Sequence, residues 1–227
     1  DFLTTGEIRN AISMPSLDAA ALAELGPYLD LATALGKVLA KLGPASPDAL
    51  RVSYHGPLAE RDTGLVSRHV LTALLAAGCN EGQVNIVNAP AVAKSMGLDL
   101  TESTISAATE FSELLVAELT KGDTKFRLAG TIIGRTPRIV EIDRIFVDTN
   151  IEGHFLIVSN DDHPGIVGAL GNALGEAGVN IANMSLARNE QAGNALTIIE
   201  VDQPLAAEVM ETVRTVAGIL SVTGVTL

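Results

Sequence analysis

The chain has 227 residues, of which 47% are hydrophobic, and a formal net charge of -12 at pH 7. This length suffices for one large domain or two ordinary domains, and the acidic balance excludes nucleic acid and anionic membrane surfaces, because binding to phosphates requires a basic surface. Its one cysteine, Cys79, excludes a disulfide framework or a cysteine-rich metal site within one chain. This low cysteine content fits a reducing compartment, so we expect a cytoplasmic protein, and no apolar run approaches the roughly 18 residues of a membrane-spanning helix.

The first part of the chain predicts an α+β unit. Residues 1–15 are predicted to form the end of a helix and the segment that leaves it, because Gly6 and Pro15 favour breaks in regular structure. Apolar positions recur at helical spacing over residues 17–42, where Gly26-Pro27 predicts a break into two helices. Further helices are predicted at residues 65–77 and 89–96, and strands at residues 50–55, 100–106, 113–120, 125–133 and 139–142. Residues up to about 148 are therefore expected to form an antiparallel sheet with helices.

The second part predicts a smaller unit of alternating strands and helices. Strands are expected at residues 154–159, 180–187, 194–201 and 219–225, and helices at residues 165–177 and 205–216. This order is βαββαβ, the ferredoxin-like split arrangement, in which two helices cover one face of a four-stranded sheet. The exposed edges of such a sheet recruit further strands, so pairing with a second copy is expected.

The turn between the first strand and helix of this second part has residues that suit a small zwitterion. Free N–H groups around Gly165 can hold a carboxylate, and Pro164 suits the first helical turn. Asp162 can pair with an ammonium group, and the amide of Asn180 can donate and accept hydrogen bonds. We expect these groups to lie side by side. The alternative is structural, with Asp162 as an N-cap and Asn180 as a turn residue.

Arg135, Arg138 and Arg144 lie close together in the sequence of an otherwise acidic chain. Guanidinium groups bind phosphates and carboxylates through paired hydrogen bonds. A phosphorylated or carboxylate metabolite is therefore a candidate ligand of these arginines. The alternative is a set of solvated charges near a domain junction.

The sequence has neither a GxGxxG dinucleotide fingerprint after a strand nor a GxxxxGK[ST] phosphate loop. The four histidines, His55, His69, His154 and His163, lack the spacing of metal ligands. We therefore predict no catalytic residues, no metal site and no cofactor site in this chain.

The turn carries a family signature. Asn160, Asp162 and Pro164-Gly165 fit a polar residue, any residue, Asp or Asn, any residue, and then Pro-Gly, and Val179-Asn180-Ile181 follows. This segment resembles an ACT domain, one of a family of amino-acid-sensing regulatory modules.

The whole chain is similar to the C-terminal regulatory half of long-form D-3-phosphoglycerate dehydrogenases. The opening DFLTTGEIRNAISMP resembles the exit from the nucleotide-binding domain. The segments VNIVNAPAVAKSMGLDLTES and GTIIGRTPRIVEIDRIFVD resemble the intervening, or allosteric substrate-binding, domain. The resemblance implies a linker at residues 1–15, an intervening domain at 16–150 and an ACT domain at 151–227. Because the chain also begins without methionine, we expect it to be a piece of a longer protein.

The resemblance further implies a function. The full enzyme would oxidise 3-phosphoglycerate with NAD in the first step of L-serine synthesis, as a cytoplasmic homo-oligomer. L-serine would bind between two ACT domains as a feedback effector, with Asn160, Asp162, Pro164, Gly165 and Asn180 at its site. Asn160 stands where His or Tyr is often found. The basic site of the intervening domain would correspond to Arg138 and Arg144.

Two other functions are compatible with parts of the sequence. The β subunit of an iron–sulfur L-serine dehydratase also joins an α+β domain to an ACT domain. That family carries a serine-rich segment near its N-terminus, which this chain lacks. The second alternative is a stand-alone amino-acid-sensing module.

Overall fold

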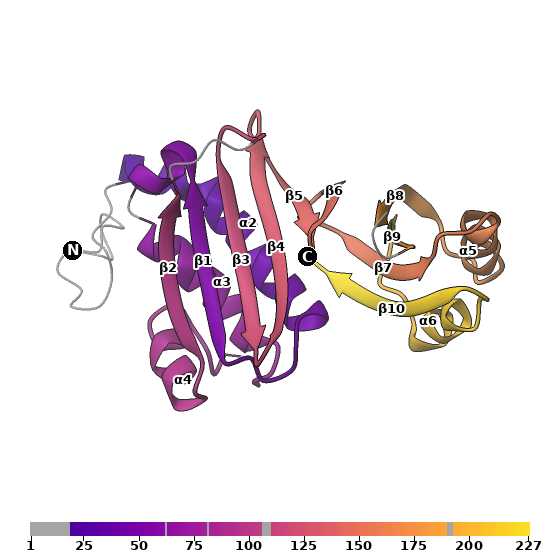
Figure 1. Ribbon diagram of the computed structural model, residues 1–227, viewed down its shortest axis with the longest axis horizontal. Helices are drawn as coiled ribbons and strands as arrows, with labels where there is room; N and C mark the ends of the chain where they lie inside the picture. Colours follow the sequence, from indigo (N-terminus) through magenta and orange to yellow (C-terminus); the bar gives the residue numbers. More distant parts are fainter. Residues whose placement is uncertain (1–18, 62, 81, 106–109, 190–192) are drawn as a thin grey trace. The chain divides into compact units, whose positions relative to one another are not determined.

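The structure, a computed structural model, describes residues 19–227 except residues 62, 81, 106–109 and 190–192. The segment 1–15, expected to end a helix and form a linker, lies outside the described residues. The chain divides into two compact units at the peptide bond between Ile139 and Val140, within one strand of the first sheet. Figure 1 shows one sheet in the N-terminal half of the chain and another in the C-terminal half.

The first sheet has the strand order β2-β1-β3-β4-β5-β6 in the described part of the chain. Its strands are β1 (Ala49–His55), β2 (Asp99–Ile105), β3 (Leu114–Lys121), β4 (Thr124–Ile133), β5 (Thr136–Ile142) and β6 (Ile145–Thr149). Strand β6 is an addition to the predicted set. It is only five residues long, too short for a clear alternating pattern.

One strand pair of this sheet differs from the expectation. Strand β1 pairs antiparallel with β3, which agrees with the expected antiparallel sheet, but parallel with β2, with Leu50 opposite Leu100. The chain passes between β1 and β2 through the helices α3 (Gly64–Ala76) and α4 (Ala89–Ser95). Such a long crossover returns the next strand in the same direction, whereas a tight turn reverses it. The α+β class is confirmed, with one parallel pair in a mostly antiparallel sheet.

Helix α2 (Ala19–Leu42) is continuous, so the predicted break at Gly26-Pro27 is wrong. A proline inside a helix removes one hydrogen bond and costs about 3 kcal/mol. Burial along the following turns offsets this cost, since a fully buried leucine contributes about 1.5–3 kcal/mol. The buried apolar side chains after the proline are those of Tyr28, Leu31, Ala32, Leu35, Val38 and Leu39.

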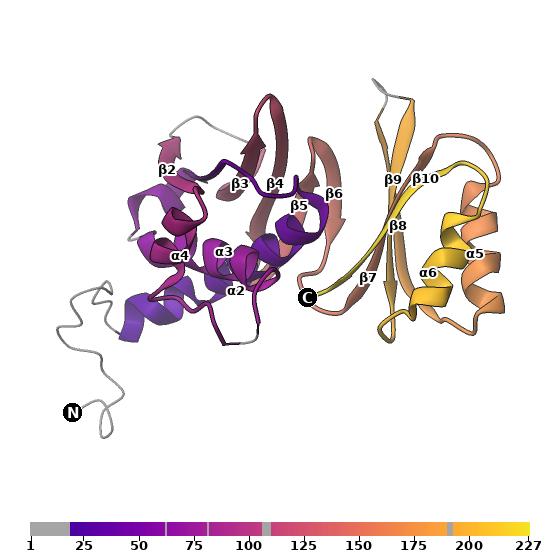
Figure 2. The ribbon, with the colours of Figure 1, turned by 90° about the horizontal axis from the view of Figure 1, so that it is seen from below.

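Helices α2 and α3 lie together on one face of the first sheet (Figure 2). Their axes approach closely at Gly36, where a Cβ atom would meet the carbonyl oxygen of Val70 and lie 2.7 Å from Cβ of Ala73. A glycine is therefore required at this crossing. The short 3-10 helix η1 (Gly56–Glu60) directly follows β1.

The second sheet has the strand order β10-β7-β9-β8. Its strands are β7 (His154–Asp161), β8 (Ile181–Asn189), β9 (Asn194–Val201) and β10 (Ile219–Thr226). The helices α5 (Ile166–Glu176) and α6 (Ala207–Arg214) lie on the same face of this sheet (Figure 2). The predicted βαββαβ order is confirmed, with element ends shifted by one or two residues.

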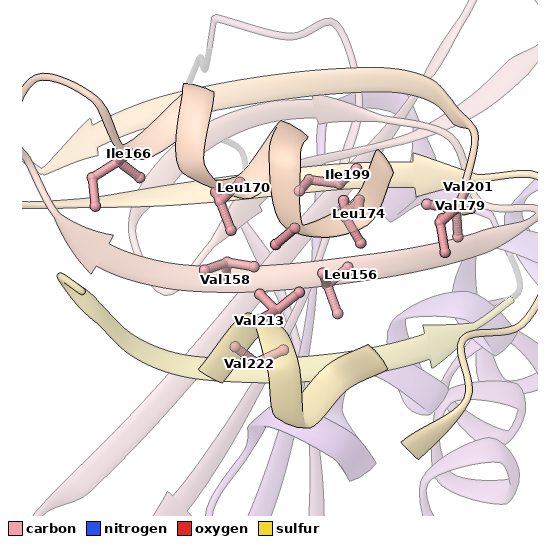
Figure 3. Close-up of a cluster of buried hydrophobic side chains, with 11 residues drawn as sticks. Leu156, Val158, Ile166, Leu170, Leu174, Val179, Ile199, Val201, Val213 and Val222 are labelled. Atoms are coloured by element: carbon pink, nitrogen blue, oxygen red, sulfur yellow. The ribbon is translucent and has the colours of Figure 1, made fainter. Parts of the chain in front are cut away.

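The core of the second unit lies between its two helices and its sheet (Figure 3). Alternate residues of β7, Leu156 and Val158, face the helices because side chains alternate along a strand. Leu170 and Leu174 of α5 meet them, since residues four apart share one helix face. The same face of β7 continues to Asn160, at the end where the candidate site lies. Among the described residues, no helix has both the length and the apolar character needed to span a membrane.

Candidate functional site

The turn between β7 and α5 forms the rim of a cavity. Gly165 is the N-cap of α5 and has a left-handed backbone with φ of 99°, which favours glycine. Pro164 precedes this cap instead of occupying the first helical turn. No side chain caps the helix at Gly165, and the first bond across the helix start runs from Ala169 N to Gly165 O at 2.9 Å. The N–H groups of the first turn therefore carry partial positive charge at the cavity.

The cavity has a volume of about 380 Å³ and combines charged and apolar side chains. Its lining residues are Asn160, Asp162, His163, Pro164, Gly165, Ile166, Val167, Leu186 and Arg188. An ion pair of 3.1 Å joins Arg188 Nε to Asp162 Oδ2. The side chain of Arg188 is 68% exposed and that of Asp162 32% exposed, so solvent and solutes can reach both charges.

Asn160 lies at the inner wall of the cavity and is 1% exposed. Its side-chain oxygen accepts a hydrogen bond from the Thr197 hydroxyl at 2.9 Å. Its side-chain nitrogen donates to the carbonyl of Asp161, also at 2.9 Å. Both ends of the amide are thus used to fix the end of β7 and the start of the turn.

Asn180 lies far from this cavity in a single chain, so the expected side-by-side placement with Asp162 is wrong within one chain. Strand register shows the separation: Asp161 pairs with Asn194, whereas the start of β8 at Ile181 pairs with Val201 at the other end of β9. Seven residue steps along β9 correspond to roughly 23 Å. The cause is helix α5, which carries the chain back along the sheet before β8 begins. Asn180 there donates to Asp202 at 2.6 Å.

The three candidate arginines are also spread out. Arg135 lies in the turn before β5, Arg138 within β5, and Arg144 in the turn after it. Because β5 is an extended strand of seven residues, its two ends are separated by roughly 20 Å. One small anion therefore cannot contact all three guanidinium groups.

Arg188 is the charged cavity residue that sequence reasoning missed. It lies 26 positions after Asp162 and belongs to no motif. Sheet register brings it close: Asn160 on β7 and Arg188 on β8 both pair with Ala195 on β9. The two residues are thus two strands apart, about 10 Å between backbones, and on the same face of the sheet. Only the strand order could have revealed this neighbour.

The second unit is a split βαββαβ domain with a polar cavity at its first strand–helix turn. Residues 154–218 match the family described as ACT domain. Residues 24–143 match the family described as D-3-phosphoglycerate dehydrogenase intervening domain. The chain therefore belongs to the D-3-phosphoglycerate dehydrogenase intervening-domain family, and its intervening domain is followed by an ACT domain.

Several relatives that match nearly the whole chain are named D-3-phosphoglycerate dehydrogenase. The protein from Methanocaldococcus jannaschii is 31% identical over 98% of this chain and 42% of its own length. The Archaeoglobus fulgidus protein is 31% identical over 97% of this chain and 42% of its own length, and the Bacillus subtilis protein 26% over 95% and 41%. The chain thus spans less than half the length of these relatives. These matches confirm the resemblance to the C-terminal regulatory half of this family.

Proposed function

We propose that this chain is the regulatory part of a D-3-phosphoglycerate dehydrogenase and binds L-serine at its ACT domain for feedback control. The complete enzyme would use NAD to oxidise 3-phosphoglycerate in the first step of L-serine synthesis. Family membership and the names of the relatives support the enzyme assignment. The observation that carries the effector assignment is the cavity beside the β7–α5 turn, with Asp162 and Arg188 at its rim.

The chemistry of the cavity suits an amino acid. The Asp162 carboxylate attracts an ammonium group, while the first turn of α5 and the Arg188 guanidinium attract a carboxylate. Ile166, Val167 and Leu186 supply an apolar wall, which suits a small side chain. A volume of about 380 Å³ exceeds that of serine, so serine alone would not fill the cavity. A further protein surface that covers the cavity would complete the site.

A second copy of the chain can supply this surface. Strand β8 is an edge strand, with a neighbour on only one side among the described residues. Edge strands pair readily, and closed dimers are two-fold symmetric. Antiparallel pairing of β8 with its symmetry mate sets the start of one strand beside the end of the other. Asn180 of one copy would then lie next to Asp162 and Arg188 of the second copy, where L-serine would bridge the two.

Such a bridge gives a route to regulation. A ligand shifts an equilibrium only by its difference in affinity for the two states. Serine that contacts both copies stabilises the paired ACT domains over the separated ones. Feedback control then follows if the catalytic part works differently in the two arrangements.

Calorimetric titration of the 227-residue chain with L-serine tests this function, with glycine and D-serine as controls. We expect saturable binding selective for L-serine, and sedimentation velocity should show that L-serine increases self-association. The proposal fails if a folded sample takes up no L-serine at millimolar concentration. Binding without any change in association would retain the effector and reject the bridge.

A further inference from the structure

A contribution to stability does not explain why Asp162 and Arg188 form an ion pair at the cavity. The ion pair joins the turn after β7 to the edge strand β8 through a contact of 3.1 Å between Nε and Oδ2. The arginine side chain is 68% exposed, and exposed ion pairs of this kind contribute little to stability. Yet both residues line the same cavity. Two opposite charges thus lie a few ångströms apart in a cavity that is large enough for a small ligand.

The geometry of the pair leaves room for a second pair of charges. The contact joins Nε of Arg188 to one oxygen of Asp162, and the guanidinium group has further N–H donors on its two terminal nitrogens. Guanidinium nitrogens bind a carboxylate through two parallel hydrogen bonds. The second Asp162 oxygen can accept a hydrogen bond from an ammonium group. An α-amino acid, whose ammonium and carboxylate groups are separated by one carbon, matches this spacing.

The neighbouring amide and apolar side chains do not replace these two. Asn160 already uses its side-chain oxygen and nitrogen for Thr197 and the Asp161 carbonyl. Asn180 lies at the other end of the sheet in the same chain. Ile166, Val167 and Leu186 are apolar. Within the described residues of one chain, Arg188 is the one arginine or lysine that lines the cavity.

We infer that Asp162 and Arg188 recognise the two charged ends of the same α-amino acid, so that Arg188 determines selectivity for a free carboxylate. This inference deepens the proposed function and rests on amino-acid binding at the ACT domain. It makes the recognition of the zwitterion a property of one chain. A second copy adds affinity and coupling, but it does not supply the charges that distinguish an amino acid from an amine.

The test compares Arg188→Gln with the wild-type 227-residue chain. The matched control is Arg214→Gln, because Arg214 also forms an exposed ion pair, at 3.0 Å with Glu211, but on α6 and outside the cavity. Two ligands are titrated into each protein: L-serine, and serinol, which keeps the ammonium and hydroxyl groups but has no carboxylate. Thermal unfolding of each variant confirms that it is folded.

We expect the wild type and Arg214→Gln to bind L-serine at least about tenfold more tightly than serinol, because a charge-assisted bidentate contact is lost with the carboxylate. Arg188→Gln should weaken L-serine binding about tenfold and leave serinol binding nearly unchanged. The two ligands then bind this variant with similar affinity. That loss of discrimination is the signature of a carboxylate contact, since a general defect in the cavity would weaken both ligands.

Two results overturn the inference separately from the proposed function. If Arg188→Gln binds L-serine as the wild type does, the first turn of α5 holds the carboxylate, and the effector site stands without Arg188. If the wild type binds glycine, L-alanine or L-valine but no L-serine, the serine proposal fails. The role of Arg188 is then decided by comparing the amino acid that binds with its amine analogue in the same variants. If the wild type binds none of these amino acids, both proposals fail.

Discussion

The side-chain oxygen of Asn160 on β7 accepts a hydrogen bond of 2.9 Å from the hydroxyl of Thr197 on β9, and both side chains are buried. Replacing Asn160 by alanine leaves the Thr197 hydroxyl without this acceptor in a buried place. We expect Asn160→Ala to lower the free energy of unfolding by about 1–3 kcal/mol, as measured by chemical denaturation.

Thr197→Val provides the control for this pair. It removes the hydroxyl and keeps the shape of the side chain, and the double variant with Asn160→Ala should cost less than the sum of the two single changes. Strict additivity of the two free energies would mean that the hydrogen bond contributes nothing to stability.

Gly36 of α2 is the clearest steric requirement in the first unit. Gly36→Ala would press a methyl group against the Val70 carbonyl and against Cβ of Ala73. Although alanine is the better helix former, we expect unfolding to become easier by about 1–3 kcal/mol because α2 and α3 must separate. Gly171→Ala in α5 is the control, since a Cβ atom there meets nothing within 4 Å. This change should raise the free energy of unfolding by about 0.5–1 kcal/mol. Equal effects of the two changes in thermal unfolding would contradict this account of the helix crossing.

The variant Asn180→Ala distinguishes a serine site within one chain from a serine site shared by two copies. Asn180 is exposed and lies at the end of the sheet away from the cavity, so Asn180→Ala should change the unfolding free energy by no more than about 0.5 kcal/mol. If two copies pair through β8, the same change should weaken L-serine binding about tenfold through the loss of a hydrogen bond at the bridge. Asn172→Ala, at an exposed position of α5, serves as the control. Unchanged serine affinity in Asn180→Ala would argue against the bridged arrangement.

Stability should depend on pH through the histidines of the first unit. Burial lowers the pKa of His69 below its ordinary value of 6.5, although the charge of Asp30 opposes this effect. His55 follows the same direction, through burial and the charge of Arg127. Protonation then favours the unfolded chain, so stability falls as pH drops below about 6.5. Burial raises the pKa of Glu113, which acts in the opposite direction at lower pH.

The variant His69→Gln isolates this contribution. Its free energy of unfolding, measured by denaturation between pH 7 and pH 5, should vary less steeply with pH than that of the wild type. Identical slopes for the two proteins would show that His69 takes up protons equally in the folded and unfolded states.

Local patterns predicted most of the elements, because strand and helix periodicities depend on residues close in sequence. The βαββαβ order of the second unit follows from such periods and from glycine and proline positions. The helix break predicted at Pro27 is wrong, because the burial of Leu31 and Leu35 against the sheet and α3 outweighs the cost of the proline. The parallel pairing of β1 with β2 also escaped, because it depends on the path of the chain between them.

The candidate site was predicted only where it is continuous in sequence. The turn from Asn160 to Gly165 was found by its motif, and the structure brings its residues to one cavity. Arg188 was missed because strand order, not sequence distance, makes it a neighbour of Asp162. Asn180 was misplaced for the converse reason, since closeness in sequence across α5 becomes distance along the sheet.

The most direct test of the account is the affinity of Asp162→Ala for L-serine, measured by calorimetry beside the wild type and Asp161→Ala. Asp161 is an adjacent exposed carboxylate whose side chain does not line the cavity, so it controls for the loss of one negative charge. We predict saturable binding to the wild type and to Asp161→Ala, and none to a folded Asp162→Ala chain. Wild-type affinity in Asp162→Ala would contradict the assignment of this cavity as the effector site.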